Sequence, residues 1–426
     1  MSEGHLKRSV SGDKPGIHSE KKKKKKVNPA GTISASTTTV VTKTLLDDAR
    51  NGFKNGNFVC SPLSLEIVLG MLAAGAEGQT LKQLLEFLGH ESIIQLLSES
   101  PTQILSNPGL DFSLANGVWV NKRLEPVRTS YQYVLASVYK TEAKYVDFED
   151  KAKLDEAVEE INSWVHKETK GLIPTIVERS TFSQDDLMVF VNALYFKGAW
   201  SYPFTLGFTR NRDFYLINGE KVSVPFMTVY KRFYYGSFKG YKMIKFPYKC
   251  KDPSKKFSMY IFLPHEKDGL KNLMELFHSD DALFHGDFDL KKERFDELLI
   301  PKFRISCTFE PEDVIKQMGL TLPFENSNTE LSGIVNMRGL YDNKLYVSKI
   351  LQESVIEVDE RGTEAAAVTM MHMTGGGGPP PPPPQRFVAD HPFMFMIRED
   401  TSKAVLFVGA VLNPSSELSS ALTLSS

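Results

Sequence analysis

The chain has 426 residues, of which 41% are hydrophobic and 24% are charged. This balance is typical of a globular protein and excludes wholesale disorder, a collagen-like repeat and a coiled-coil rod. The 51 basic and 52 acidic residues leave a net charge of -1, which argues against a polyanion-binding surface over the whole molecule. Length alone predicts two or three domains.

Residues 1–36 differ from the rest of the chain in charge and composition. They carry nine basic and three acidic residues, a net charge of +6, whereas the remainder carries 42 and 49, a net charge of -7. Few large apolar side chains occur here, so burial cannot offset the entropy cost of ordering, and we expect a disordered basic arm. The run Lys21–Lys26 predicts a nuclear import signal, a weak nucleic-acid contact or simply a solvated tail.

The three cysteines are Cys60, Cys250 and Cys307. An odd number at no metal-ligand spacing predicts neither a disulfide framework nor a metal site, and we expect no cofactor. The N-terminus lacks the apolar core of a secretory signal, and no run of about 18 apolar residues occurs. We therefore expect an intracellular protein, in the nucleus, the cytoplasm or both, without a membrane contact.

Two helices stand out in the first half of the chain. Ser61 and Pro62 are a typical cap and first turn for the apolar run that follows them. Residues 154–169 have an apolar stripe at helical spacing and are followed by Gly171, which predicts an amphipathic helix over a sheet. In the second half, short β-branched or aromatic runs predict strands at 187–197, 257–263, 299–305 and 405–411.

Enzyme motifs are missing from the sequence. We find no nucleophile elbow, phosphate-binding loop, dinucleotide fingerprint or paired-histidine zinc motif, so we expect no enzymatic activity. Cys60 precedes an apolar helix and is interpreted as a small buried hydrophobe. His391 has an acidic neighbour but no identifiable nucleophile, and is interpreted as structural.

The segment 359–386 fits no ordinary core. It contains four glycines, Gly375–Gly378, and six prolines, Pro379–Pro384. The glycines give the most flexible backbone available, and the prolines favour an extended polyproline helix. We expect an exposed loop.

Three motifs lie around this loop: Asp359-Glu-Arg-Gly-Thr-Glu-Ala-Ala-Ala367, Phe387-Val-Ala-Asp-His-Pro-Phe393 and Phe407-Val-Gly-Ala-Val-Leu-Asn-Pro414. With these motifs the sequence resembles the serpin family of protease inhibitors. Further matches follow in serpin order at Ser61–Ser64, Asn162–Gly171, Asn192–Trp200, Met318–Leu320 and Leu331–Gly333. The form of the second motif is most similar to plant serpins.

The resemblance implies a mixed α+β fold rather than two or three domains. The expected domain is a single one over 37–414, with three β-sheets, about nine helices and an exposed reactive-centre loop at 362–386. Residues 415–426 would form a C-terminal tail.

The resemblance also implies a suicide inhibitor whose cleaved loop inserts into the main sheet. The hinge residues would be Glu360, Gly362, Thr363, Glu364, Ala365, Ala366 and Ala367. Because strand side chains alternate, Thr363, Ala365 and Ala367 would face the body of the protein while Glu364 stays on the wet face. Small inward side chains would allow this hinge to become a strand.

The family's usual spacing places the scissile bond between Gly376 and Gly377. Glycine offers no side chain for a protease's primary pocket, so the target cannot be inferred from this bond. Pro379–Pro384 cannot donate N–H groups to a sheet, so insertion must stop before them. Met370, Met371 and Met373 are alternative cleavage positions, which would leave a shorter inserting strand.

The resemblance assigns Ser61, Ser64 and Asn192 to the polar centre of the main sheet, and Trp200 to its top. Gln352 stands where serpins usually carry a histidine that bridges the strands between which the loop inserts. Glutamine still donates and accepts hydrogen bonds. The polar residues also have an ordinary role in satisfying the core, and Trp200 and Phe393 are interpreted chiefly as buried area.

Two functions remain open. The first is an inhibitor that forms a covalent complex with a serine or cysteine protease. The alternative is a non-inhibitory serpin-fold binding protein that uses its Gly/Pro-rich loop, through a polyproline-binding partner, or its Lys-rich tail.

Overall fold

The computed structural model describes residues 34–54, 56–105, 110–124, 126–280, 282–336, 344–361 and 383–416. The following predictions lie outside the described residues: the arm through residue 33 with Lys21–Lys26, the hinge residues Gly362, Thr363, Glu364, Ala365, Ala366 and Ala367, the bond between Gly376 and Gly377, and the tail from residue 417.

The first helices are fixed by serine caps. Helix α1 (Ala35–Arg50) begins where Ser34 Oγ accepts the N–H of Thr37, two residues before the expected domain start at 37. Helix α2 (Pro62–Ala73) begins after Ser61, as predicted, and all of its residues are buried. Its apolar residues surround the helix on every side, which is typical of a helix inside the core.

The remaining helices are short apart from α7. They are α3 (Gly78–Leu88), α4 (Ile93–Ser98), α5 (Thr102–Leu105), α6 (Thr129–Val134), α7 (Leu154–Glu168), α8 (Leu270–Ser279), α9 (Ala282–His285) and α10 (Glu312–Gln317). Single turns of 3₁₀ or π geometry are η1 (Lys122–Leu124), η2 (Leu135–Tyr139), η3 (Arg179–Thr181), η4 (Leu206–Phe208) and η5 (Leu322–Phe324).

The strands form three sheets. The seven-stranded sheet has the order β1-β16-β15-β9-β8-β7-β10, the four-stranded sheet β14-β11-β6-β5 and the five-stranded sheet β12-β13-β4-β2-β3. Their bounds are β1 (Phe58–Cys60), β2 (Asp111–Asn121), β3 (Ala143–Val146), β4 (Met188–Lys197), β5 (Arg210–Tyr215), β6 (Lys221–Met227), β7 (Phe233–Phe238), β8 (Tyr241–Pro247), β9 (Phe257–Pro264), β10 (Lys291–Glu293), β11 (Phe295–Pro301), β12 (Phe303–Phe309), β13 (Lys349–Val358), β14 (Gln385–Val388), β15 (Phe393–Glu399) and β16 (Val405–Val411).

Three of the four predicted strands are confirmed, as β4, β9 and β16. The prediction of one strand over 299–305 is wrong, because β11 ends at Pro301 and β12 begins at Phe303 in a different sheet. The N–H of Lys302 still donates to the carbonyl of Pro225, in register with the β11–β6 ladder, whereas the next residue, Phe303, pairs with Val358 of β13. The apolar run therefore passes from one sheet to another.

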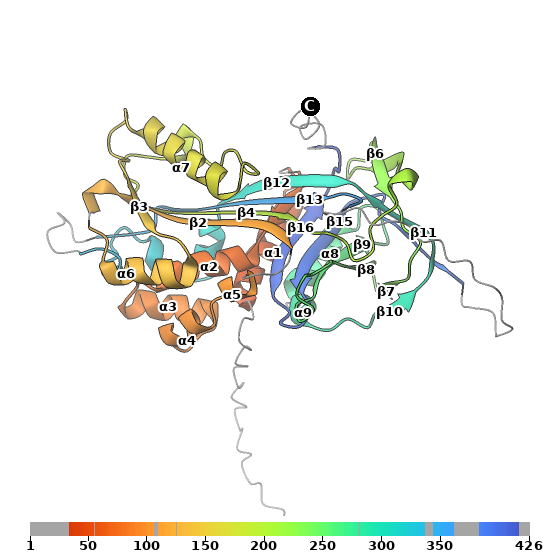
Figure 1. The fold of residues 1–426 in the computed structure, drawn as a ribbon, viewed down its shortest axis with the longest axis horizontal. Helices are drawn as coiled ribbons and strands as arrows, with labels where there is room; N and C mark the ends of the chain where they lie inside the picture. Colours follow the sequence, from red (N-terminus) through yellow and green to blue (C-terminus); the bar gives the residue numbers. More distant parts are fainter. Residues whose placement is uncertain are drawn as a thin grey trace, which may run out of the picture.

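The five-stranded sheet is covered on both faces (Figure 1). Helix α7 lies on one face, as its predicted stripe required: Ile161 and Val165 pack in one apolar cluster with residues of β4 and β13. Helices α2, α3 and α6 lie on the other side of the sheet, and their apolar residues join a cluster that continues from α1 to β16. This continuous core shows that the expectation of two or three domains from length is wrong, and that the mixed α+β expectation is right.

Candidate functional site

The central feature of the five-stranded sheet is the parallel pairing of β4 with β13, here called the seam. Its register runs from Lys349 opposite Val189 to Ile356 opposite Phe196. Both strands pair antiparallel with their outer neighbours, β2 and β12. A chain that left the end of β13 and folded straight back would be antiparallel to both seam strands, which is the arrangement that a strand between two parallel neighbours needs.

At the middle of the seam, Gln352 lies directly opposite Asn192. Gln352 Oε1 accepts the N–H of Ser61 at 2.9 Å and the S–H of Cys60 at 2.9 Å, and its Nε2 donates to the carbonyl of Ser61 at 3.1 Å. Asn192 Nδ2 instead donates to Asn116 Oδ1 on β2 at 2.7 Å. Gln352 therefore ties β13 to the start of α2 and does not bridge the seam.

Three polar atoms in or beside the seam are buried without a hydrogen-bond partner among the described residues. They are Asn192 Oδ1, Ser354 Oγ on β13 and Ser64 Oγ on α2. Ser61, by contrast, is satisfied because its Oγ accepts the N–H of Ser64 and its backbone binds Gln352. Buried polar atoms normally have partners, so the centre of the seam retains unused hydrogen-bonding capacity.

Trp200 lies beyond the C-terminal end of the seam. Its ring is buried and stacks on Tyr248, with the ring centroids 4.5 Å apart. Its Nε1–H donates to the carbonyl of Asp359 at 2.8 Å. The interpretation of Trp200 as buried area is therefore incomplete, because the indole also fixes the chain where it leaves β13.

Charged groups bridge the seam at this end. Lys197 Nζ on β4 lies 2.5 Å from Glu357 Oε1 on β13 and 2.9 Å from Asp359 Oδ2. Burial alone would lower the pKa of Lys197, but these two carboxylates raise it. Tyr195 also donates to Glu357 Oε2 at 3.1 Å, and burial together with that carboxylate raises the pKa of Tyr195 to about 12.

Glu360, the first of the predicted hinge residues, is buried. Its Oε1 accepts the hydroxyl of Thr209 at 2.7 Å, its Oε2 lies 2.8 Å from Lys302 Nζ, and its carbonyl accepts the N–H of Phe204 at 3.0 Å. Burial alone would raise the pKa of Glu360, but the bonds from Lys302 and Thr209 outweigh it and hold the pKa below its usual value. The carboxylate is thus charged and fully partnered.

The sequence analysis missed Lys197, Thr209 and Lys302. The adjacent acids Asp359 and Glu360 were a signal that cations lie nearby. The local sequence does not identify these cations, because Lys197 is 162 positions from Asp359 and the sheet register determines which residues pair.

The chain that follows the loop is anchored to another sheet. Strand β14 pairs parallel with β11, and the N–H of Gln385 donates to the carbonyl of Arg294 at 2.7 Å. Arg386 Nε lies 2.6 Å from Glu297 Oε2. One end of the loop is therefore held by the five-stranded sheet and the other by the four-stranded sheet.

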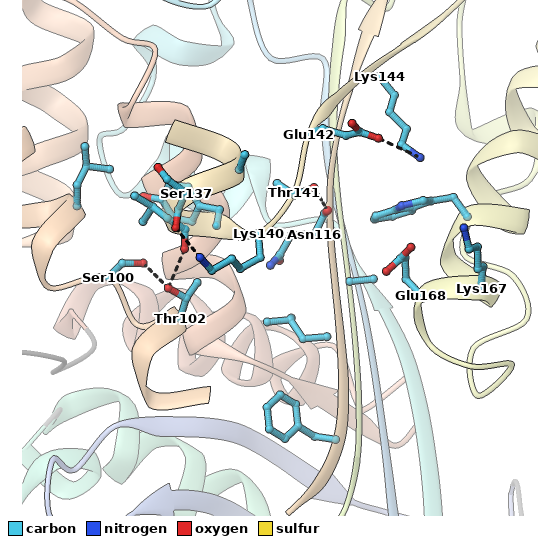
Figure 2. Close-up of a pocket in the computed structure, with 18 of the residues that line it drawn as sticks. Ser100, Thr102, Asn116, Ser137, Lys140, Thr141, Glu142, Lys144, Lys167 and Glu168 are labelled. Carbon is cyan, nitrogen blue, oxygen red and sulfur yellow. Dashed lines mark hydrogen bonds and ion pairs between the residues drawn. The ribbon is translucent and has the colours of Figure 1, made fainter. Parts of the chain in front are cut away.

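A cavity of about 1070 Å³ opens at the β2–β3 edge of the five-stranded sheet, which is the edge away from β12. Figure 2 shows that it reaches both sides of β2, with Asn116 and Lys140 toward one side and Lys167 and Glu168 toward the other. Strand β3 pairs only with Val118–Asn121 of β2, which leaves the earlier part of β2 as an edge. Asn116 lines the cavity, but none of the predicted site residues does.

Other expectations fall on described residues. Cys60, Cys250 and Cys307 all lie in the described part of the chain and are not joined by disulfides, and Cys60 is buried as predicted. His391 is buried between Asp390 Oδ1 and the carbonyl of Pro264, as a structural histidine would be. In the described part of the chain, no helix is long and apolar enough to cross a bilayer, and no three His, Cys, Asp or Glu residues gather as they would around a metal ion.

Comparison with known proteins decides the family. The family model for Serpin (serine protease inhibitor) matches residues 36–414. The chain belongs to the serpin family. It is 38% identical over 380 residues to Serpin-Z10 of Arabidopsis thaliana, covering 88% of this chain and 95% of that protein. It is 39% identical over 365 residues to Serpin-Z2B of Triticum aestivum, covering 84% of this chain and 90% of that protein.

Solved serpin structures have the same fold. A structure of Arabidopsis AtSerpin1 in its native stressed conformation superposes with a TM-score of 0.79 at 33% identity, covering 89% of this chain and 97% of that one. Serpin48 of the insect Tenebrio molitor superposes with a TM-score of 0.74 at 27% identity, covering 90% and 96%. This serpin is therefore a mixed α+β protein with three sheets, most similar in sequence to plant serpins.

Proposed function

We propose that this serpin inhibits serine or cysteine endopeptidases as a suicide substrate, by inserting its cleaved loop into the seam. The observation that carries the proposal is the parallel pairing of β4 and β13, with the loop leaving from the end of β13. A strand that folds back there forms two ladders of hydrogen bonds in place of the single ladder between β4 and β13 that it separates. Ten or more new bonds, each worth about 0.5–1.5 kcal/mol net, supply on the order of 10 kcal/mol.

The chemical step belongs to the protease. Its serine Oγ or cysteine Sγ attacks the carbonyl carbon of Gly376, the C–N bond to Gly377 breaks, and the new amine of Gly377 takes the proton. The product is an acyl-enzyme joined to the new end of the loop. Insertion must carry this linkage away before water hydrolyses it, otherwise the serpin is only a substrate.

The hinge composition supports insertion. Thr363, Ala365 and Ala367 share one face of the new strand and are all small, so they can enter a packed sheet without burying a charge. Glu364 falls on the other face.

Opening the seam has a structural cost. Trp200 must release the carbonyl of Asp359, and the bonds of Lys197 that cross between the strands must break or shift. Val191 on β4 and Val355 on β13 also pack in one cluster with α7, so α7 must move from the seam during insertion. We propose that these contacts hold the uncleaved form until the protease cuts.

A second function is favoured by the middle of the seam and by the end of the loop. Gln352 leaves Asn192 unbridged, and Pro383 and Pro384 are exposed before β14. A non-inhibitory serpin could present the run Pro379–Pro384 to an aromatic-lined groove that reads polyproline helices. Such a protein would be cut without trapping the protease.

A gel assay distinguishes the two functions. The full chain is incubated with trypsin, pancreatic elastase and papain, separated under denaturing conditions, and the released C-terminal peptide is sequenced. The inhibitor proposal expects a covalent complex and a peptide that begins at Gly377. Cleavage by all three without a complex, together with capture of a polyproline-binding domain by a peptide of residues 375–386, would support the second function instead.

We also propose that the protein acts in the nucleus or the cytoplasm. An odd number of cysteines that are not joined by disulfides suits a reducing compartment, and Lys21–Lys26 supply a cationic signal or a weak nucleic-acid contact. A fluorescent fusion with and without residues 1–33 tests this proposal. Loss of nuclear signal on deletion would support an import role, whereas fluorescence confined to a secretory compartment would contradict it.

A further inference from the structure

An exposed apolar cluster lies between the five-stranded and four-stranded sheets. Leu206 is 51% exposed, Phe208 50% and Tyr230 71%. The rings of Phe208 and Tyr230 touch edge to face, with their centroids 5.8 Å apart. These three residues are called the aromatic patch; they come from η4 and from the turn between β6 and β7. Scattered exposed apolar residues are ordinary, but a contiguous group of large ones marks a contact surface.

The aromatic patch is fixed to the place where the loop leaves the body. Phe204, just before η4, donates its N–H to the carbonyl of Glu360, and Thr209, just after η4, donates its hydroxyl to the Glu360 carboxylate. The N–H of Thr205 donates to the carbonyl of Thr228, which joins the turn of Tyr230 to η4. In Figure 1 this region, beside β6, lies at the same end of the molecule as β11, away from α3 and α6.

Basic residues follow closely after the patch residues in the sequence. Arg210, Lys231 and Arg232 are all exposed. Among the described residues none of the three has a carboxylate within ion-pair distance, and Arg210 Nη1 donates only to the carbonyl of Thr209. An apolar centre with a charged rim is the usual anatomy of a protein-binding surface, and aromatic residues and arginine are enriched among the residues that dominate binding.

The reactive bond makes such a surface necessary. Gly376 has no side chain to fill a protease's primary pocket, so the loop lacks the anchor that normally supplies recognition energy. A protease that accepts this loop must gain affinity elsewhere. The aromatic patch is an exposed surface with apolar anchors, and the bonds from Thr209 and Phe204 to Glu360 hold it beside the start of the loop.

We propose that the aromatic patch and its basic rim are a docking site for the target protease, which presents an acidic surface with an apolar centre beside its active-site cleft. The inference rests on the proposed inhibitory function and names the part of the body that selects the target. The aromatic residues supply contact area, and Arg210, Lys231 and Arg232 steer an acidic partner into position. Single-stranded nucleic acid could also use aromatic and basic groups, but the position beside the loop favours the protease.

The test compares two double variants with controls of the same type. Phe208→Ser with Tyr230→Ser removes the rings, and Lys231→Glu with Arg232→Glu reverses the rim. The controls are Tyr133→Ser, a tyrosine of α6 that is 73% exposed, and Lys82→Glu with Lys167→Glu on α3 and α7. Far-ultraviolet circular dichroism and thermal unfolding check that every variant is folded. The rate constant for covalent complex formation is then measured with trypsin, pancreatic elastase and papain, in low and high salt.

The expected result is a fall of about tenfold in that rate constant for each patch variant with at least one protease, and no change for the controls. The Lys231→Glu, Arg232→Glu variant should also lose most of the salt dependence, because rim charges act mainly on association rate. Cleavage of a free peptide of residues 362–386 by the same proteases provides the loop-only rate. Equal rates for wild type and both patch variants with every protease would overturn the proposal.

A binding assay keeps this result separate from the proposed function. If wild type forms no covalent complex, the inhibitory mechanism fails, and binding is measured with the same proteases after their active sites are blocked. Binding of a blocked protease that the patch variants lose would support the docking site alone. If wild type bound no blocked protease, the docking site would be overturned. It would also be overturned if the only effect of the patch variants were loss of binding to oligo(dT), a single-stranded DNA probe.

Discussion

The middle and the C-terminal end of the seam are held by different chemistry. At the middle, neutral groups bind along one strand at a time: Gln352 binds the start of α2, and Asn192 binds β2. At the end, Lys197 joins Glu357 and Asp359 across the two strands. The seam is therefore closed by charge where the loop begins, and is crossed only by backbone bonds and packing where Gln352 faces Asn192.

This difference suggests an order of events. If the cleaved loop inserts as proposed, a strand that enters from the end of β13 meets the charged bridge first, and that bridge would control the start of insertion. The unpartnered oxygens of Asn192 and Ser64 lie further along and could accept new hydrogen bonds once the strands separate. Under this proposal, the end of the seam would govern when insertion starts, and the middle would contribute to how favourable it is.

The largest expected effect comes from blocking insertion itself. Thr363→Arg places a guanidinium on the inward face of the hinge, and burying an unpaired charge costs several kcal/mol, so we expect at least about 100-fold less covalent complex. Cleavage should continue, and the product should be a cut serpin without protease attached. The matched control is Glu364→Arg, on the opposite face, which should still form complex. Similar losses in both variants would contradict the strand alternation.

Gln352→Leu tests the neutral middle of the seam. It leaves the N–H and the carbonyl of Ser61 without the bonds that Gln352 provides, and we expect a loss of about 2–4 kcal/mol in the free energy of unfolding. Urea unfolding of the uncleaved protein measures it. Leu351→Met, its neighbour in the α7-facing cluster, serves as the control and should cost less than about 1.5 kcal/mol. If Gln352→Leu were as mild as the control, the bonds to Ser61 would not hold β13.

Glu312 makes a pH-dependent contribution at the other end of β13. Its carboxylate accepts the N–H of Ile350, and burial raises its pKa from 4.5 to about 7. Because this pKa is higher in the folded than in the unfolded protein, the contribution of Glu312 to stability is complete below about pH 4.5 and is lost as the pH rises to 7. Between pH 5 and pH 8, the free energy of unfolding of the wild type, measured by urea unfolding, should therefore fall by on the order of 2 kcal/mol relative to that of Glu312→Gln. Glu310→Gln, at an exposed neighbour, should follow the wild type, and parallel pH curves for all three proteins would refute the assignment.

Lys302→Met tests the charged end with the smallest expected effect. Glu360 keeps Thr209 as a partner, so the free energy of unfolding should fall by about 1–2 kcal/mol at neutral pH. Because Lys302 and Thr209 hold the pKa of Glu360 below its usual value of 4.5, this contribution to stability is present above that pH and disappears as pH falls below it. The difference from wild type should therefore shrink in acid. Lys291→Met, at an exposed position of β10, is the control, and a difference that grew in acid would reverse the argument.

Local sequence patterns predicted the elements that have a local cause. The cap at Ser61, the stripe of α7 and the apolar runs of β4, β9 and β16 were all predicted correctly. The division of 299–305 between two sheets was not, because it depends on distant strands: Lys302 donates to Pro225 in β6, whereas Phe303 pairs with Val358 of β13.

The candidate site shows the same limit. Family resemblance led to Gln352, Asn192 and Trp200, but it could not show that Gln352 binds Ser61 rather than Asn192. The partners of Glu360, Thr209 and Lys302, come from distant parts of the chain that only the folded sheets bring together. Side-chain pairing over such separations depends on sheet register and has no local signature.

Thermal unfolding of the protein before and after a single cut at Gly376 tests the central claim most directly. If the cut loop becomes a strand between β4 and β13, the gain of on the order of 10 kcal/mol should raise the unfolding temperature by at least about 10 °C. The cut form of Thr363→Arg should show no such rise. An unchanged or lower unfolding temperature in the cut wild type would contradict loop insertion and, with it, the inhibitory mechanism.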